Sequence, residues 1–163
     1  MPSFDVVSKV DLQTLDNAVN VAVKEIGTRY DLRNSKTTVD LDKKAPSLRI
    51  ETDNEMNLKS VEDVLLGRMV KQGLDGRCLD FGATPTPHGS RLRKDLKVRQ
   101  GLDKDQQRKI LKAIKDGFPK VTAQAMDDQV RVSSKKIDEL QAVIAHLRRT
   151  IQDVPLQFVN MKS

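Results

Sequence analysis

Four basic residues stand at alternate positions within one short segment, interrupted only by Asp95. Side chains in a β-strand point alternately to its two faces, so a strand over residues 91–99 would place these cations on one face above an apolar underside. A row of fixed cations suits the phosphates of a nucleotide or a nucleic-acid backbone. A solvated surface strand is the alternative, because lysine and arginine on an edge strand also discourage aggregation. The four residues are Arg91, Arg93, Lys97 and Arg99. If residues 47–52 form the neighbouring strand, Arg49 joins them.

A second basic cluster lies at residues 131–136 (RVSSKK), where a predicted strand leads into a predicted helix. It contains Arg131, Lys135 and Lys136. Amide groups at a helix N-terminus attract anions. Lysines in a first helical turn oppose the helix dipole, so a bound phosphate would relieve that conflict. The alternative is that Ser134 merely caps the helix and that both lysines are solvated.

Tyr30, the only tyrosine, lies in residues 29–33 just past the first predicted helix. It could stack on a base. We favour the alternative, a partly buried ring with its hydroxyl group in water.

Nothing in the chain predicts catalysis. Its two histidines, His88 and His146, belong to no known catalytic motif, and glycine-rich phosphate loops are absent. The single cysteine, Cys78, excludes an intramolecular disulfide and any multi-cysteine metal site. We therefore expect a protein without enzymatic activity, metal or cofactor.

Composition predicts a soluble protein of one ordinary or two small domains. The 163 residues are 37% hydrophobic and carry a net charge of +6. The charge is uneven: residues 1–90 hold 12 Lys or Arg against 14 Asp or Glu, whereas residues 91–163 hold 17 against 9. A basic segment favours acidic partners. We see neither a signal peptide nor a membrane-spanning run and expect a cytoplasmic protein.

Apolar periodicity predicts four amphipathic helices. They follow Asp11, Asp53 or Asn54, Asp103 and Ser134, and the first three end near glycines 27, 73 and 117. Alternating segments between them predict strands over residues 4–9, 37–42, 47–52, 77–81, 92–99, 121–126, 129–133 and 156–160. The order strand-helix-strand-strand-helix-strand thus occurs twice, with a Pro/Gly-rich loop at residues 82–90 between the repeats. Each repeat has the connectivity of a ferredoxin-like α+β sandwich, whose helices leave one face of the sheet open.

Five segments, in this order along nearly the whole chain, resemble the YajQ family of small bacterial proteins. They are residues 3–11, 29–33, 97–103, 131–136 and 156–160. Two of them depart from the family pattern. The usual Phe-Asp-Phe-Lys-Gly is Tyr-Asp-Leu-Arg-Asn at residues 30–34, which keeps a positive charge at Arg33, and the usual Thr-Gly-Lys-Lys is Ser-Ser-Lys-Lys at residues 133–136.

The resemblance implies a tandem of two ferredoxin-like, RNP-like βαββαβ domains that exchange their first strands. One domain would comprise residues 10–99 and use the strand at 91–99. The other would comprise residues 1–9 and 100–163 and use the strand at 4–9. First strands are central in this topology, so the cationic row would cross the middle of an open sheet.

The resemblance also implies a nucleotide-binding protein without established enzymatic activity, with cyclic di-GMP or RNA as the ligand. Few aromatic residues stand at exposed strand positions, which disfavours sequence-specific reading of RNA. The predicted binding residues are Arg91, Arg93, Lys97, Arg99, Arg49, Arg131, Lys135, Lys136, Tyr30 and Arg33. The alternative is a protein-interaction adaptor whose basic sheet face binds an acidic protein partner. We expect a monomer that does not bind membranes.

Overall fold

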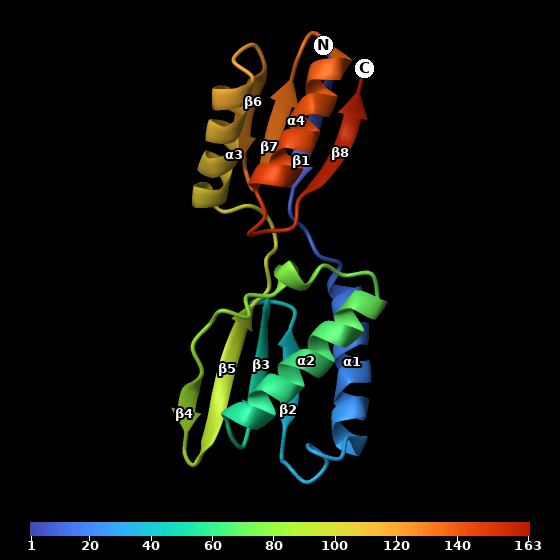
Figure 1. Ribbon diagram of the computed structural model, residues 1–163, viewed down its shortest axis with the longest axis vertical. Coiled ribbons are helices and arrows are strands. Elements are labelled where there is room, and N and C mark those ends of the chain that lie inside the picture. The colour runs from blue at the N-terminus through green and yellow to red at the C-terminus, as the bar shows by residue number, and fades with distance from the viewer. The chain divides into compact units, whose positions relative to one another are not determined.

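The computed structural model describes all residues, 1–163, and they form two compact units. We call residues 10–99 the middle unit, and residues 1–9 together with 100–163 the terminal unit. Within each unit two helices cover one face of a four-stranded antiparallel sheet (Figure 1). The mixed α+β fold predicted from the sequence, a tandem of two ferredoxin-like units, is confirmed.

The middle unit contains six main elements and one short 3₁₀ helix, η1. Its sheet has the order β2-β3-β5-β4, so β5 is a central strand. Its elements are α1 (Leu12–Thr28), β2 (Thr38–Asp42), β3 (Ser47–Thr52), α2 (Glu55–Lys71), η1 (Gly76–Cys78), β4 (Thr86–His88) and β5 (Arg91–Lys97).

The terminal unit repeats this plan with strands from both ends of the chain. Its sheet has the order β6-β7-β1-β8, so the N-terminal strand is central here. Its elements are β1 (Ser3–Val7), α3 (Lys104–Gly117), β6 (Thr122–Met126), β7 (Gln129–Ser133), α4 (Ile137–Thr150) and β8 (Gln157–Lys162). By chain order β1 precedes the middle unit and β5 precedes the terminal unit, so the two repeats have exchanged their first strands.

Three of the four helices begin where the sequence predicts. The side chains of Asp11, Asn54 and Asp103 accept hydrogen bonds from backbone amides in the first turns of α1, α2 and α3. These bonds satisfy amides that would otherwise lack a partner. The predicted start of α4 is wrong. Ser134 Oγ accepts from the Lys136 amide across a turn, so the helix begins only at Ile137 and both lysines precede it.

The strand predicted at residues 77–81 is also wrong. The Asp75 side chain accepts from the Arg77 amide and starts η1, and afterwards only Leu79 forms a single β-bridge, to Val98. The fourth strand of the sheet is β4, within the segment predicted as a loop between the repeats. All three residues of β4 are exposed, so no apolar alternation signals it. Its proline is tolerated because β4 is an edge strand.

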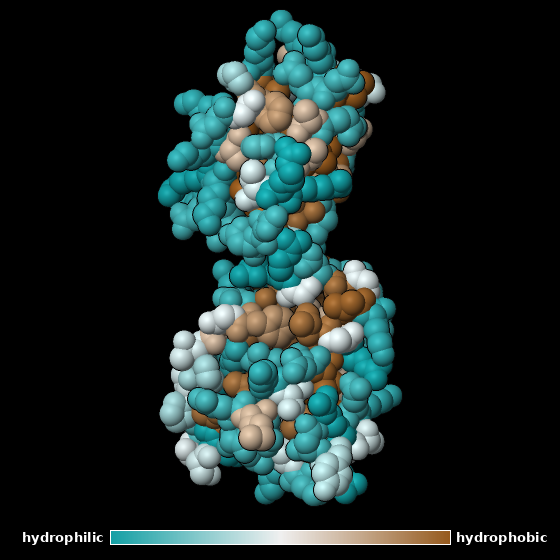
Figure 2. Space-filling view, in the orientation of Figure 1, coloured by the Kyte–Doolittle hydropathy of each residue, from teal (hydrophilic) through white to brown (hydrophobic).

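Each unit has its own hydrophobic core between helices and sheet. Leu15, Leu65 and Leu96 are fully buried in the middle unit, and Phe4, Ile110 and Leu140 in the terminal unit. Hydrophobic surface in the middle unit gathers over the C-terminal end of α2 (Figure 2), where Leu66 and Val70 are partly exposed. No helix has both the length and the apolar character needed to cross a membrane.

Candidate anion-binding site

The open face of the middle sheet carries the cationic row predicted from the sequence. Arg91 and Arg93 lie on β5 and keep about a quarter of their side-chain surface exposed, 27% and 29%. Arg49 lies on β3, directly opposite Asp95, as expected for neighbouring strands. Lys97 ends β5 and is exposed.

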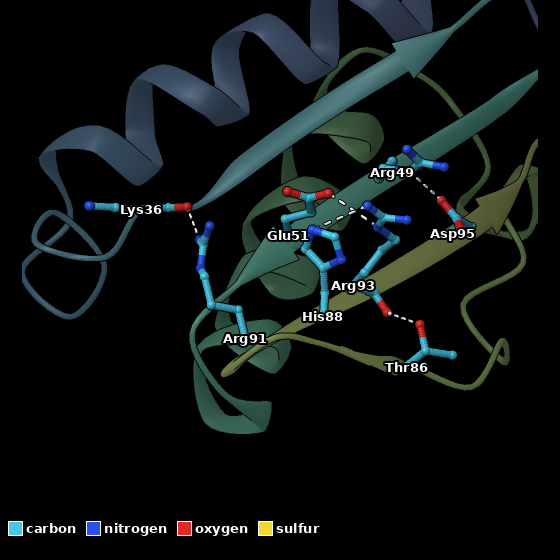
Figure 3. Close-up of polar contacts among 8 residues, drawn as sticks. All are labelled: Lys36, Arg49, Glu51, Thr86, His88, Arg91, Arg93 and Asp95. Carbon is cyan, nitrogen blue, oxygen red and sulfur yellow. Dashed lines mark hydrogen bonds and ion pairs between the residues drawn. The ribbon is translucent and has the colours of Figure 1, made fainter.

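Carboxylates neutralise this row (Figure 3). Arg93 Nε lies 3.2 Å from Glu51 Oε1, and Arg49 Nε donates to Asp95 Oδ1 at 2.9 Å. The bond to Asp95 raises the pKa of the Arg49 guanidinium. Arg93 also lies 3.3 Å from the His88 ring.

Arg91 is held in the same way at the other end of the row. Its Nε lies 3.2 Å from Asp53 Oδ1. Its terminal nitrogen donates to the Lys36 carbonyl oxygen, as Figure 3 shows. Lys97 alone among the cations of this face has no ion-pair partner.

Counted over the whole open face, the charges cancel. Strand alternation and cross-strand pairing place four carboxylates among the four cations. The carboxylates are Asp40, Asp42, Glu51 and Asp95, and the cations are Arg49, Arg91, Arg93 and Lys97. The sequence prediction of a basic sheet face is therefore wrong for this sheet, because neighbouring strands supply opposite charges.

Arg99 does not belong to this face. It lies beyond the end of β5, where a guanidinium nitrogen is 3.5 Å from the Leu79 carbonyl oxygen and another is 3.9 Å from Asp80. It contributes to the wall of a different, wide recess beside η1.

Lys94 is a feature of β5 that the sequence prediction missed. It points to the apolar side of the strand, where its side chain is only 7% exposed. Its Nζ donates to Glu62 Oε1 and to the Phe81 carbonyl oxygen, both at 2.7 Å. Its position in the alternation with Leu92 and Leu96 was the available signal.

Tyr30 is 85% exposed, so the packed position favoured from the sequence is wrong. It lies in the turn after α1, where the Arg33 guanidinium carbon is 5.2 Å from its ring centroid. A cation over an aromatic face is favourable but weak at an exposed site. The pair is an exposed aromatic surface separate from the row on β5.

The structure divides the second predicted cluster into two places. Arg131 lies on the open face of β7, where its Nε donates to Asp5 Oδ1 at 2.9 Å. Lys135 and Lys136 lie in the turn before α4 and are exposed. This unit thus brings its basic residues to two neighbouring hollows instead of one.

The larger hollow, which we call the lysine cleft, has a volume of about 510 Å³. It is lined by Met1, Lys120, Thr122, Ser133, Ser134, Lys135, Lys136 and Glu139. None of its three lysines is in an ion pair, so three ammonium groups face one carboxylate. Lys136 is also the N-cap of α4, the one helix whose N-cap side chain makes no hydrogen bond. Lys120 is a member that the sequence prediction missed, because only the fold brings it beside Lys135.

Other titratable groups offer no comparable site. Burial raises the pKa of the Cys78 thiol to about 11, so the thiol stays protonated and unreactive. His146 packs edge-on against Phe118. No group of three or more His, Cys, Asp or Glu residues is placed to hold a metal ion.

Comparison with known proteins gives matches along almost the whole chain. Residues 2–162 match the family described as "Nucleotide-binding protein YajQ-like". A protein of Cytophaga hutchinsonii named "Nucleotide-binding protein" is 52% identical over 162 residues, which cover 99% of this chain and 100% of that protein. Proteins of the same name from Nitratidesulfovibrio vulgaris and Geotalea daltonii are 46% and 44% identical, covering 100% and 99% of both chains. The similarity therefore extends over both units.

Proposed function

This chain belongs to the YajQ-like family, and from that membership we propose that it is a nucleotide-binding protein whose ligand places its phosphates in the lysine cleft. The observation that carries the choice of site is the difference in charge between the open face of the middle sheet and the lysine cleft. The middle sheet balances four cations with four carboxylates. The lysine cleft holds three unpaired lysines against one carboxylate.

The cleft has the other groups that phosphates need. Lysine ammonium groups bind phosphate as point charges. The hydroxyl-bearing side chains of Thr122, Ser133 and Ser134 line the same cleft. The first turn of α4 adds backbone amides that no side chain caps, and such amides attract anions.

We propose a cyclic dinucleotide, cyclic di-GMP first, as the ligand, and single-stranded RNA as the second candidate. A hollow of about 510 Å³ is of the size that encloses a small molecule. RNA-binding sheets of this topology stack bases on exposed aromatic side chains. In the terminal unit Phe4 is buried, and Phe158 packs against Phe4 and beneath Arg148. This arrangement favours a compact nucleotide over a long strand of RNA.

Isothermal titration calorimetry with cyclic di-GMP, GTP and a short single-stranded RNA tests the function. We expect binding of at least one of them, and recovery of the ligand chemically unchanged after incubation would support binding without turnover. Absence of binding to all three at concentrations up to about 1 mM would contradict the proposal.

Matched charge variants test the site. Lys135→Gln/Lys136→Gln should weaken binding about tenfold or more, because two phosphate contacts are lost. Lys104→Gln/Lys112→Gln removes the same charge from exposed positions of α3 and should change affinity less than about threefold. Arg93→Gln/Lys97→Gln tests the middle sheet. If this last variant alone loses affinity, the phosphates bind on β5 and the lysine cleft is not the site.

The adaptor hypothesis predicts a different result. An acidic partner protein would need a surface with excess positive charge. The open face of the middle sheet has no excess positive charge, so an acidic partner would also have to bind at the lysine cleft. It would gain support only if no nucleotide bound.

A further inference from the structure

A second, smaller hollow lies on the open face of the terminal sheet. It has a volume of about 330 Å³ and is lined by Ser3, Asp5, Arg131, Asn160 and Lys162, which come from β1, β7 and β8. We call it the Asp5 recess. None of its five side chains is apolar, so its walls consist of one carboxylate among hydroxyl, amide and cationic groups.

The Asp5 carboxylate is a hydrogen-bond acceptor that neighbouring side chains hold in place within this recess. Its side chain is only 3% exposed. Arg131 Nε donates to Oδ1 and Asn160 Nδ2 donates to Oδ2, each at 2.9 Å. The bond from Arg131 is the main cause of a lowered pKa of Asp5, so the carboxylate is ionised at neutral pH.

Hydrogen-bonding capacity remains for a ligand. Each carboxylate oxygen can accept about two hydrogen bonds, and each accepts one within the protein. Arg131 uses only Nε, so its terminal nitrogens are available as donors. Ser3 Oγ and Lys162 Nζ make no side-chain hydrogen bond or ion pair within the protein. The recess therefore offers acceptors and donors side by side.

The backbone beneath the recess is irregular in a way that favours this arrangement. Asn160 has a positive φ of 57°, which is uncommon outside glycine. The pairing of β8 with β1 shifts between Ser3 and Asp5, so β8 contains a bulge at this point. Bulges often lie beside functional sites, where they redirect a side chain. Here Asn160 lies in the bulge, and its side-chain amide donates to Asp5.

The chemistry of the lining suits a sugar better than the other two parts of a nucleotide. A phosphate would lie against the nearly buried carboxylate of Asp5, which is already paired with Arg131. A base needs an apolar or aromatic surface on which to stack, and the lining has none. A sugar fits, because its hydroxyl groups donate to a carboxylate and accept from arginine or lysine.

The two hollows adjoin. Ser3 lines the Asp5 recess, Ser133 lines the lysine cleft, and these residues are direct partners in the pairing of β1 with β7. Such partners lie about 5 Å apart. Phosphate and ribose are bonded to each other in a nucleotide, so phosphates in the cleft place the sugar near the recess.

We propose that the Asp5 recess binds the ribose of the nucleotide whose phosphates lie in the lysine cleft, with the Asp5 carboxylate accepting a hydrogen bond from the 2′-hydroxyl group. This inference rests on the proposed function and makes it more specific. It assigns to the protein a preference for ribonucleotides over deoxyribonucleotides, set by Asp5 with Arg131 and Asn160 as its supports.

Titration of the unaltered protein with ligand pairs that differ only at the 2′ position tests the inference. The pairs are cyclic di-GMP with its 2′-deoxy analogue and GTP with dGTP. For whichever pair binds, the ribo form should bind about tenfold more tightly or better, because the deoxy form lacks the hydroxyl group that would donate a hydrogen bond to the charged Asp5 carboxylate. Equal affinities within the pair, together with weaker binding by Lys135→Gln/Lys136→Gln, would overturn the ribose assignment and leave the phosphate site standing. No binding by either pair would contradict the proposed function itself.

Asp5→Asn provides the matching protein variant, because it keeps the shape and removes the charge. It should reduce the ribo-to-deoxy ratio severalfold. Asp153→Asn makes the same change at an exposed carboxylate near Lys109 and should leave the ratio unchanged. A folded Asp5→Asn protein that keeps the full ratio would overturn the proposal, and if this variant does not fold, the ligand pairs on the unaltered protein still decide.

Discussion

Asp5 is the only carboxylate residue of this chain that is almost fully buried. A buried charge is costly unless it is paired and hydrogen-bonded. Arg131 and Asn160 meet both conditions, and their separation from Asp5 by 126 and 155 residues shows that only the folded sheet brings them together. The native state therefore stabilises the ionised form of this one side chain.

This stabilisation predicts a dependence on pH. The folded pKa of Asp5 lies below its ordinary value of 3.8, so the contribution is complete above that value and is lost as the pH falls through the folded pKa. Asp5→Asn should lower the free energy of unfolding by about 1.5–3 kcal/mol at pH 7, the range for a hydrogen bond to a charged group. The difference from the unaltered protein should shrink at pH 3. Urea unfolding at both pH values measures it, and an equal difference at both would contradict the assignment.

The sequence predicted single residues well where local chemistry determines them. Asp11 and Asp103 cap helices because an aspartate before an apolar periodic segment can do so without distant partners. The sequence prediction failed where the partner lies far away along the chain. The carboxylates that neutralise Arg91 and Arg93 lie about 40 residues away, at Asp53 and Glu51, and the alternation of charge on β5 contains no sign of them.

At the scale of elements, the turn between Arg99 and α3 depends on Gly101. Its φ is +91°, and a Cβ added there would lie 2.5 Å from Asp128 Oδ2 and 2.7 Å from Asp128 Cβ. Its amide donates to the Ser8 carbonyl oxygen at 2.6 Å. Two requirements therefore favour glycine at position 101: the positive φ, and the lack of space for a Cβ atom beside Asp128.

Gly101→Ala and Gly89→Ala separate these two requirements. Gly89 also has a positive φ, +65°, but open space around its Cβ position. Gly89→Ala should cost about 1 kcal/mol, the conformational term alone. Gly101→Ala should cost about 2–4 kcal/mol, because overpacking adds to it. Thermal or urea unfolding gives both values, and equal losses would show that Asp128 moves aside without cost.

Lys94 joins β5 to α2 and to the segment around Phe81. Because Lys94 is almost fully buried and Glu62 is 21% exposed, loss of the carboxylate leaves an ammonium group with one acceptor. Glu62→Ala should destabilise the protein by about 2–3 kcal/mol. Lys94→Met/Glu62→Leu should cost less, because two apolar side chains leave no unpaired charge. Urea unfolding of both variants tests the order, and a more stable single variant would contradict it.

The sequence predicted the helices and most strands because periodicity is a local signal, and the repeated element order was enough for the fold class. It misplaced the edge strand of the middle sheet. Thr86, Pro87 and His88 are all exposed, and their position depends on pairing with Arg93, Leu92 and Arg91. An edge strand with no buried residue is determined by its neighbour, which no local pattern reveals.

For the whole molecule, the exchange of first strands redistributes charge. By chain order the first repeat is acidic and the second is strongly basic. In the structure the middle unit holds 16 Lys or Arg against 14 Asp or Glu, and the terminal unit 13 against 9. The two units thus carry net charges of +2 and +4. Most of the difference in charge between the two halves of the sequence comes from five basic residues on and beside β5. In the structure these residues belong to the middle unit, together with most of the acidic first half.

The exchange also determines which part of the chain can fold alone. Residues 10–99 contain α1, α2 and all four strands of the middle sheet. Residues 1–90 form a fragment of the same length but lack β5, the strand to which both β3 and β4 pair. Without β5 the core loses Leu96 and Val98, and Lys94 no longer reaches Glu62.

We therefore predict that the fragment of residues 10–99 folds cooperatively and that the fragment of residues 1–90 does not. Far-UV circular dichroism with thermal unfolding distinguishes them, since a two-state domain shows one sharp transition and a chain without a central strand shows none. The equal length of the fragments excludes size as the cause. A cooperative transition in residues 1–90 would mean that β1 can occupy the place of β5 in the middle sheet. The exchange would then be one of two accessible pairings, and not a requirement of the fold.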